Sequence, residues 1–261
     1  IVKRGVTELV TPGVSMNDEV LQSKSNNFLA AIHFGAKSLG IAFLDVSTGE
    51  FLTAQGNEEY IDKLLQNFSP SEILISKANK NDFKDAFGSD HHTFIIDEWV
   101  FNSEYAFETL TNHFGTISLK GFGIDDLQEG IICSGAILFY LSETQHNKRN
   151  HITNIHRIAE DQYVWMDRFT IRNLELYHSY NPNAVTLLDI IDKTISPMGG
   201  RLLKRWLALP LKDAVKISNR HDVVDYMMQN EPIMSNVQVQ IKQISDLERL
   251  ISKIAAAKVS P

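Results

Sequence analysis

Acidic residues beside predicted strands are the first candidates for chemistry, because clustered carboxylates can hold two divalent ions about 4 Å apart for hydrolysis. Asp45 and Glu50 flank the turn after the second apolar run, and Asp97 and Glu98 follow a later run. Short polar residues at such places usually form turns and caps. We interpret all four in that way and expect no metal site in this chain.

Glycine-rich stretches are the next candidates, because a phosphate-binding loop has the pattern G-x-x-x-x-G-K-[ST]. The stretch 35–38 lacks the glycine directly before Lys37. The glycines at 121–123 and 199–200 lack the following lysine and hydroxyl. We therefore expect no bound cofactor, no catalytic residue and no ATP hydrolysis in this chain.

The histidines and the cysteine do not form a recognisable ligand set. His91 and His92 are adjacent, and adjacent residues on a strand point to opposite faces. The histidines of the stretch 146–156 accompany no carboxylate motif. Cys133 is the single cysteine and stands in an apolar run, which predicts a buried, unreactive thiol.

A basic amphipathic helix is predicted at 196–209. Ser196 can cap it, and Pro197 suits its first position. At about 100° per residue, one half of this helix is apolar and includes Trp206, which we expect to be a buried anchor. The other half is basic and carries Arg201, Lys204 and Arg205. This basic face could contact phosphate or form salt bridges to another domain.

The first half of the chain alternates between strand and helix patterns. Strands are predicted at 28–34, 39–46, 51–54, 72–75 and 93–96, and helices at 58–68, 82–87, 103–114 and 126–143. This order resembles the ribonuclease-H-like layout, one mixed sheet with helices on both faces. Enzymes with that layout place an aspartate in the middle of the first strand, and residues 28–34 contain no acid. A metal-dependent nuclease of ribonuclease-H type remains the alternative function.

The second half is mostly helical and follows a polar stretch at 144–151, read as a linker. A short strand is predicted at 163–166. The 261 residues suffice for about two domains, and the net charge of −7 predicts weak binding of duplex DNA by this chain alone. The apolar runs are too short to span a membrane, and no signal peptide opens the chain, so we expect a cytoplasmic protein without membrane contact.

Several motifs, in order, resemble the MutS family of DNA mismatch-repair proteins. The stretches RNLEL, TLLDIIDKTISPMGGRLLKRWL, LPLKD and ISDLERLISKI resemble the start of its core (lever) domain. The stretches LAAIHFG, GIAFLDVSTGEF and FGTISLKGFGI resemble its connector domain, and VKRGVTELVTPGV resembles the strand that closes its mismatch-binding domain. The family's aromatic mismatch-reading motif and its ATPase cassette are not found here.

The resemblance implies a division of the chain into domains. Residues 1–20 would be the tail of the mismatch-binding domain, 21–143 the ribonuclease-H-like connector, 144–153 a linker, and 154–261 the first part of an incomplete helical core domain. The expected fold class is thus α/β followed by mostly α. A segment of a MutS paralogue that serves recombination is a further alternative.

The resemblance also implies a function without catalysis for this segment. It would relay between mismatch recognition and ATPase domains and dock the partner MutL. Mismatched duplex DNA, ATP with Mg²⁺ and dimerisation through the ATPase domain would belong to the full-length family member. For docking we predict the exposed face of helix 103–114, with Glu108, Thr109 and Asn112, while Phe107, Leu110 and Phe114 face the sheet. The resemblance favours an inter-domain relay role for Arg201, Lys204 and Arg205.

The purified chain should therefore hydrolyse neither ATP nor nucleic acid in the presence of Mg²⁺ or Mn²⁺. The test is a turnover assay on the wild-type chain beside Asp45→Asn and Glu50→Gln variants. Metal-dependent cleavage that persists through purification and disappears in either variant would establish the nuclease alternative.

Overall fold

The computed structural model describes residues 9–144, 149–177, 179, 181 and 184–257, which fall into two compact units. The first unit takes in residues up to 21, residues 27–158 and the stretch from 248 onward. The second takes in residues 22–26 and 159–247. Residues 1–8 of the predicted tail 1–20 and residues 145–148 of the predicted linker lie outside the described residues.

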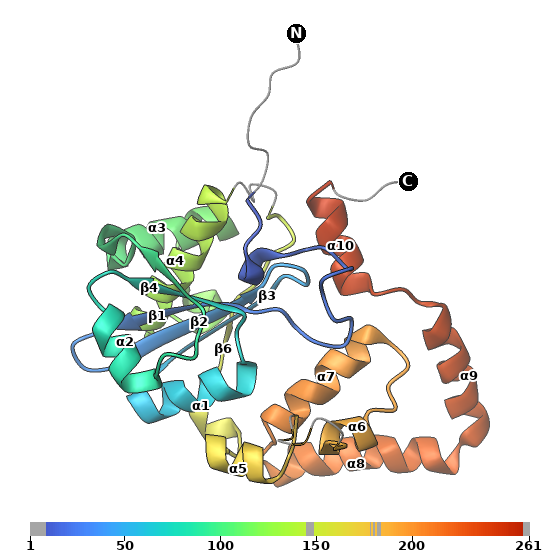
Figure 1. Ribbon diagram of the computed structural model, residues 1–261. Helices are drawn as coiled ribbons and strands as arrows, with labels where there is room; N and C mark the ends of the chain where they lie inside the picture. The colour runs from blue at the N-terminus through green and yellow to red at the C-terminus, as the bar shows by residue number, and fades with distance from the viewer. Residues whose placement is uncertain (1–8, 145–148, 178, 180, 182–183, 258–261) are drawn as a thin grey trace. The chain divides into compact units, whose positions relative to one another are not determined.

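The first unit is built on a six-stranded mixed sheet with the order β5-β4-β1-β2-β3-β6 (Figure 1). Its strands are β1 (Leu29–Phe34), β2 (Leu39–Asp45), β3 (Glu50–Gly56), β4 (Glu72–Ser76), β5 (Thr93–Ile96) and β6 (His156–Arg157). The first three strands form the predicted antiparallel meander, whereas β4, β5 and β6 join by parallel pairing. The two-residue strand β6 was not predicted, because so short a segment leaves no alternation to read.

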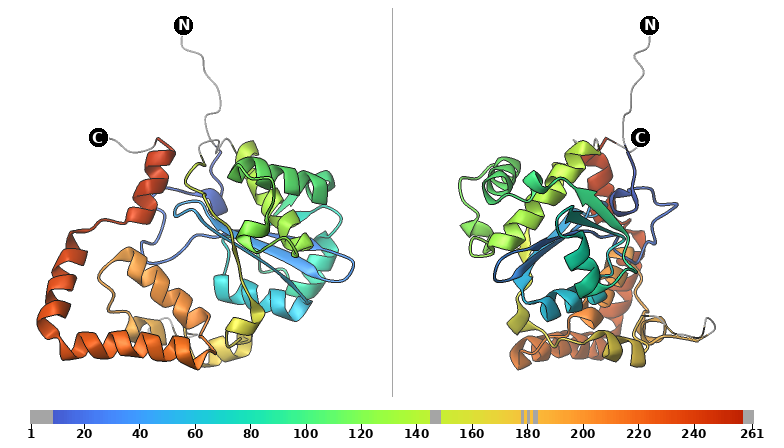
Figure 2. Two further views of the ribbon diagram at one scale, coloured as in Figure 1. Left: turned by 180° about the vertical axis from the view of Figure 1, so that it is seen from behind. Right: turned by 60° about the vertical axis from the view of Figure 1, so that its left-hand side comes forward.

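Helices cover both faces of this sheet, as Figure 2 shows from two further directions. They are α1 (Glu58–Phe68), α2 (Lys80–Phe87), α3 (Ser103–Phe114) and α4 (Gln128–Glu143), with short 3₁₀ turns η1 (Pro12–Val14), η2 (Glu98–Val100) and η3 (Lys120–Phe122). Alternate residues of a strand point to opposite faces. Leu29 and Ala31 accordingly share a buried cluster with α4 residues. On the other face Phe28 and Phe43 pack with Phe68 of α1. The predicted fold class is confirmed.

Helix α4 is buried on nearly all sides, because it packs against the sheet and also against α3. Two glycines permit this approach. A Cβ on Gly40 of β2 would overlap the backbone of Glu129 in α4. A Cβ on Gly135 of α4 would lie 2.6 Å from the Cα of Ala106 in α3. Cys133 is fully buried in this helix, as predicted, and burial raises the pKa of its thiol.

The first unit extends past the predicted linker. Ile152 and Ile155 are buried in its core, and the hydroxyl of Tyr60 donates to the carbonyl of Ile158 at 3.1 Å. His151 contributes a 2.9 Å hydrogen bond between its Nε2 and the carbonyl of Val46. Within the predicted linker 144–153, Arg149 and His151 are half-buried and Ile152 is buried, whereas Asn150 and Thr153 are exposed.

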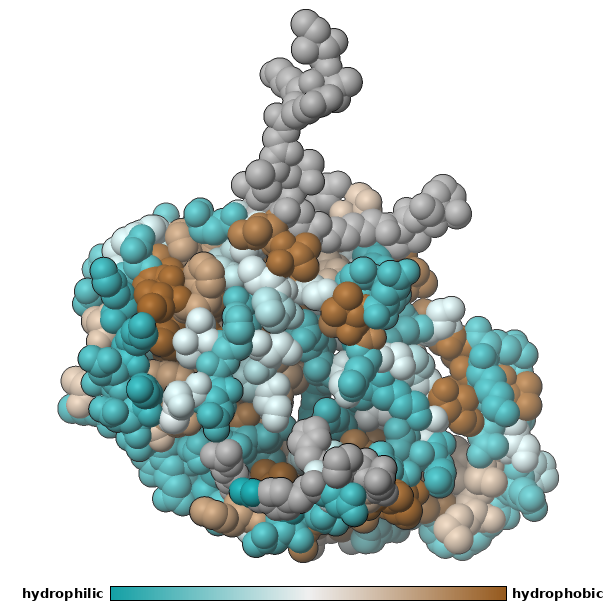
Figure 3. Space-filling model, viewed as in Figure 1, coloured by the Kyte–Doolittle hydropathy of each residue, from teal (hydrophilic) through white to brown (hydrophobic). Residues whose placement is uncertain are grey.

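The second unit is helical. Its elements are η4 (Glu160–Gln162), α5 (Arg168–Asn173), α6 (Leu187–Ile191), α7 (Pro197–Ala208), α8 (Ala214–Gln229) and α9 (Glu231–Gln243), and α10 (Leu247–Ala255) follows. The strand predicted at 163–166 is reduced to one bridge between Tyr163 and Leu211. Among the described residues of this unit, the buried apolar side chains are Leu176, Ala208 and Leu209. Many others are exposed along α8 and α9, and some appear as brown patches over α9 in Figure 3.

No helix within the described ranges has the length and apolar character needed to cross a membrane.

Replacing Gly135 with alanine tests the close contact of α3 and α4. Helix propensity alone would make this change stabilising by up to about 1 kcal/mol. Because the new Cβ meets backbone and side chain of Ala106, we expect instead a loss of about 1–3 kcal/mol in the free energy of unfolding, measured by chemical denaturation.

Gly121→Ala is the matched control, since nothing lies within 4 Å of a Cβ at that position. It should change the free energy of unfolding by less than about 0.5 kcal/mol. A Gly135→Ala protein that is more stable than the wild type would contradict the contact.

Candidate interaction site

The predicted docking helix, α3, is fixed at both ends by its own sequence. The side chain of Asn102 accepts hydrogen bonds from the backbone N–H groups of Glu104 and Tyr105, at 2.9 and 3.1 Å. Gly115 ends the helix in the left-handed region, with φ 64°. Such caps satisfy N–H and C=O groups that a helix end leaves without partners. The helix therefore presents a defined outer face.

The buried face of α3 differs from the predicted one. Ala106 and Leu110 are buried, and the helix packs on α4 rather than directly on the sheet. Phe107, predicted to face the sheet, is 43% exposed. The prediction relied on large side chains, whereas the contact with Gly135 selects the small Ala106 for the point of closest approach.

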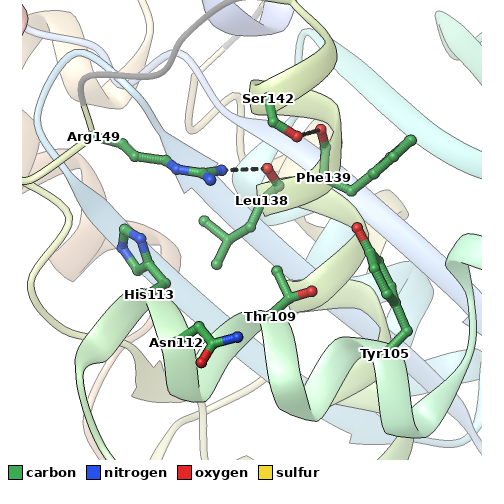
Figure 4. A pocket seen from close by; sticks show the side chains of 8 residues that line it. All are labelled: Tyr105, Thr109, Asn112, His113, Leu138, Phe139, Ser142 and Arg149. Atoms are coloured by element: carbon green, nitrogen blue, oxygen red, sulfur yellow. Dashed lines mark hydrogen bonds between the residues drawn. The ribbon is translucent and has the colours of Figure 1, made fainter.

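The three predicted docking residues are accessible, and two of them line one pocket. Glu108 and Asn112 are exposed, and Thr109 is half-buried. Thr109 and Asn112 contribute to a pocket of about 340 Å³ between α3 and α4, whereas Glu108 does not line it (Figure 4). The pocket is lined by Tyr105, Thr109, Asn112, His113, Leu138, Phe139, Ser142 and Arg149.

Arg149 gives this pocket its charge. Its guanidinium is half-buried, and Nη1 donates to the carbonyl of Leu138 at 2.5 Å. Burial lowers the pKa of Arg149, but the group stays charged because an arginine is not deprotonated in proteins. Sequence reasoning missed Arg149, since it belongs to a polar stretch that reads as linker.

The other titratable group of the pocket is His113. Its Nε2 lies 2.8 Å from the carbonyl of Ile152. Burial lowers the pKa of His113, and the nearby charge of Arg149 acts in the same direction, while the bond to Ile152 opposes them. The imidazole is thus neutral at pH 7 and donates through Nε2. Among the described residues that line the pocket, Arg149 is the one positive charge.

The second predicted site is the basic face of α7. Its N-terminus follows the prediction: the hydroxyl of Ser196 accepts from the N–H of Gly199 at 3.1 Å, and Pro197 is the first helical residue. Arg201, for which a phosphate contact or a salt bridge to another domain was predicted, is buried, with a side chain only 3% exposed. Its guanidinium donates to both carboxylate oxygens of Asp246, at 2.8 and 2.7 Å, and to the carbonyl of Ser23 at 2.7 Å.

Lys204 is engaged on the same side of α7. Its ammonium donates to the hydroxyl of Ser25 at 3.3 Å, and burial lowers its pKa. The neighbouring Lys24 forms an ion pair with Asp192 at 3.0 Å. Arg201 and Lys204 therefore hold the segment 22–26 against α7. Arg205 is half-buried.

Trp206 is not the buried anchor that the helical pattern predicts. It is 41% exposed, and the guanidinium carbon of Arg220 lies 3.7 Å from the centre of its ring. A cation over an indole ring is a favourable contact that leaves the ring partly in water. The buried residues of α7 are instead Gly200, Arg201 and Ala208. The apolar half of a helix is buried only where a partner covers it, and the polar partners of Arg201 decide the orientation here.

Two buried acidic residues, Asp45 and Glu72, have structural partners. Asp45 accepts from the N–H and the hydroxyl of Ser47, at 2.9 and 2.7 Å, which confirms it as a turn residue. Glu72 is buried in β4, where it accepts from the hydroxyl of Thr11 and the N–H of Gly13 and, at 3.0 Å, from the hydroxyl of Tyr140. Across the described residues, no group of three or more histidine, cysteine, aspartate or glutamate side chains is arranged to hold a metal ion.

A half-buried polar pair joins β1 to α4. His33 Nε2 lies 3.4 Å from a carboxylate oxygen of Glu129, and the imidazole stacks on Phe101 with ring centres 5.7 Å apart. Burial lowers the pKa of His33 and raises that of Glu129. Both shifts favour the neutral forms. This contact positions α4 and needs no charge.

Two protein-family models match this chain, one in each half. Residues 27–153 match the model of MutS domain II, and residues 169–261 match that of MutS domain III. The chain belongs to the MutS family. The family resemblance of the sequence motifs is thereby confirmed, and the described site on α3 and α4 lies in MutS domain II.

Similar proteins align with this chain over all of its 261 residues. The DNA mismatch repair protein MutS of Flavobacterium psychrophilum and that of Flavobacterium johnsoniae are each 75% identical over all 261 residues. The MutS protein of Christiangramia forsetii is 70% identical over the same length. The chain spans 30% of the length of each of these relatives.

Breaking the buried ion pair between Arg201 and Asp246 should lower the free energy of unfolding. Arg201→Leu removes the guanidinium donors to Asp246 and to the carbonyl of Ser23. Removal of one partner of a buried ion pair typically costs about 3–5 kcal/mol. We expect a loss of that size in the unfolding of the helical unit, followed by circular dichroism during denaturation.

The matched control is Arg157→Gln. Arg157 pairs with Asp126 at 2.8 Å, but both side chains are largely exposed, at 42% and 59%. An exposed pair contributes less than about 1 kcal/mol. Equal losses in the two variants would contradict the buried role of Arg201.

Proposed function

We propose that this chain is the connector and first core segment of a DNA mismatch-repair protein, with catalysis in other parts of that protein. The observation that carries this proposal is 75% identity, across the full chain, to proteins named DNA mismatch repair protein MutS. We assign the connector to the sheet-containing unit and the core segment to the helical unit. This division follows the matches to domains II and III.

Two acidic side chains of this segment are engaged in structural hydrogen bonds, which supports the proposal that the segment is not catalytic. The carboxylate of Asp45 is occupied by hydrogen bonds of its turn, and that of Glu72 by three donors from η1 and α4. Carboxylates that hold divalent ions need free oxygen lone pairs directed at a common point. No observation favours the nuclease alternative.

We further propose that the connector docks the partner MutL through the outer face of α3. Glu108 and Asn112 are exposed there, Thr109 is half-buried beside them, and the capped helix holds all three in fixed positions. Two of the three adjoin the pocket between α3 and α4. A fixed helical face with an adjacent pocket has the character of a pre-formed protein interface.

The relay role that we propose for α7 acts through the segment 22–26. Arg201 bonds the backbone of Ser23, and Lys204 bonds the side chain of Ser25. This segment continues directly along the chain to Asn27 and then to β1. A shift of α7 would pull on the chain just before the first strand of the connector. Arg205 on the same helix is the third residue of this proposal.

Mismatched duplex DNA, ATP with Mg²⁺ and a second subunit are proposed as partners of the whole protein. This chain is acidic, with a net charge of −7, so we expect its own contribution to DNA affinity to be small. We propose that the protein acts in the cytoplasm, where bacterial DNA is repaired.

Charge reversal on α3 tests the docking proposal. The double variant Glu108→Lys, Thr109→Trp should weaken binding of the organism's MutL to the intact protein by about tenfold or more, because it places a cation and a bulky ring in the interface. Binding is measured by titration, and the thermal midpoint should stay unchanged because Glu108 is exposed.

Asp85→Lys is the control variant. Asp85 is an exposed residue of α2, whose Phe87 packs against Phe34 on the opposite face of the sheet from α4. It should bind MutL as the wild type does. Unchanged affinity in the α3 variant would place the docking site elsewhere on the connector.

A further inference from the structure

The pocket between α3 and α4 holds a positive charge without a negative partner. Arg149 is half-buried, and its recorded hydrogen bond goes to the carbonyl of Leu138. Among the described residues no carboxylate forms an ion pair with it, and none lines the pocket. A guanidinium has five N–H donors. Since charges removed from water are normally paired, the free donors of Arg149 call for an anionic group from outside this chain.

An exposed aromatic cluster borders the same pocket. The Trp99 side chain is 56% exposed and stands edge-on to Tyr105 and Phe139, with ring centres 5.3 and 5.2 Å apart. Tyr105 and Phe139 both line the pocket, as Figure 4 shows. Tryptophan, tyrosine and arginine are the residues that most often dominate protein–protein binding energy. A large exposed ring at this place suits an apolar side chain of a partner.

Apart from Leu138, the remaining described lining residues are polar and carry no carboxylate. Thr109 and Asn112 extend from α3 beside the aromatic rings, and Ser142 of α4 donates to the carbonyl of Phe139 at 2.6 Å. Burial keeps His113 neutral. A phosphate-rich partner such as nucleic acid would need several cations and a basic surface. One arginine in a chain of net charge −7 suits a single carboxylate.

We propose that this pocket binds a protein segment that presents a glutamate or aspartate beside an aromatic or aliphatic side chain. The carboxylate pairs with Arg149, and the apolar side chain packs on Trp99, Tyr105 and Phe139. The volume of about 340 Å³ admits one or two side chains. This inference rests on the proposed docking function of α3 and deepens it, since it states the chemistry that the connector selects in its partner.

A pair of short peptides tests the chemistry on the 261-residue chain. The probes are acetyl-Gly-Phe-Glu-Gly-amide and the same peptide with glutamine in place of glutamate. Binding is followed by NMR through the indole N–H of Trp99 and the Nε–H of Arg149. We expect the glutamate peptide to shift both signals, and the glutamine peptide to bind roughly five- to tenfold more weakly, because one ion pair is lost.

Variants of Arg149 assign the preference to the guanidinium. Arg149→Gln should bind the two peptides equally, whereas Arg149→Lys keeps the charge and should keep a reduced preference for glutamate. The matched control Arg157→Gln alters an exposed arginine and should behave as the wild type. A glutamate preference that survives in Arg149→Gln, or equal binding of both peptides by the wild-type chain, would overturn the proposal. So would displacement of the peptide by a short DNA duplex at lower concentration than the peptide itself requires.

Binding of MutL to the intact protein separates this inference from the docking proposal. Arg149→Gln and Trp99→Ala should each weaken that binding at least fivefold while the protein stays folded. If MutL binds the wild type and both variants equally, the pocket chemistry is wrong while docking on the connector stands. If MutL does not bind the wild type at all, the docking proposal fails, and the peptide titration alone decides what the pocket binds.

Discussion

The close approach of α4 to both of its neighbours is the constraint on which the first unit depends. Because Gly40 has no side chain, the backbone of α4 can pack directly against the sheet. In the same way, Gly135 allows α3 to pack directly against α4. Side chains at either position would separate layers that are otherwise in direct contact. Because α4 is enclosed on both sides, almost every residue from Gly130 to Leu141 is buried, including the thiol of Cys133 and the hydroxyl of Ser134. The hydroxyl of Ser134 is satisfied within the helix by the carbonyl of Gly130, at 2.7 Å.

This packing also determines the surface that the molecule presents. With Ala106 and Leu110 turned toward α4, the rings of Tyr105 and Phe139 meet at the edge of the contact, and Thr109 and Asn112 border the same pocket. Arg149 lies beside the carbonyl of Leu138, to which it donates. The pocket is thus a consequence of two helices held closely together, and the proposed partner chemistry follows from the groups they leave at its edge.

Buried polar groups hold segments that hydrophobic contacts alone would leave free. In the first unit Glu72 binds the η1 turn through Thr11 and Gly13, and it binds α4 through Tyr140. In the second unit Arg201 binds Ser23 and Asp246, residues 178 and 45 positions away in the sequence. Such charges are stable inside a protein only when every partner is present. They therefore define one arrangement of the segments, which suits a family member whose proposed role is to transmit changes between domains.

The sequence alone determined most of the elements, the fold class and the family. The alternating helices and strands and the cap at Ser196 were readable because they depend on neighbouring residues. The order of the motifs was enough to indicate MutS. Only the tertiary structure decided which faces are covered. Phe107 and Trp206 look like core residues in a helical projection, yet a small residue and a buried arginine take the contacts. Arg149 and His151 read as linker, yet both bond backbone carbonyls of the folded unit. A pattern reports the period of a segment, whereas burial and pairing depend on partners distant in the chain, and these are brought together only by folding.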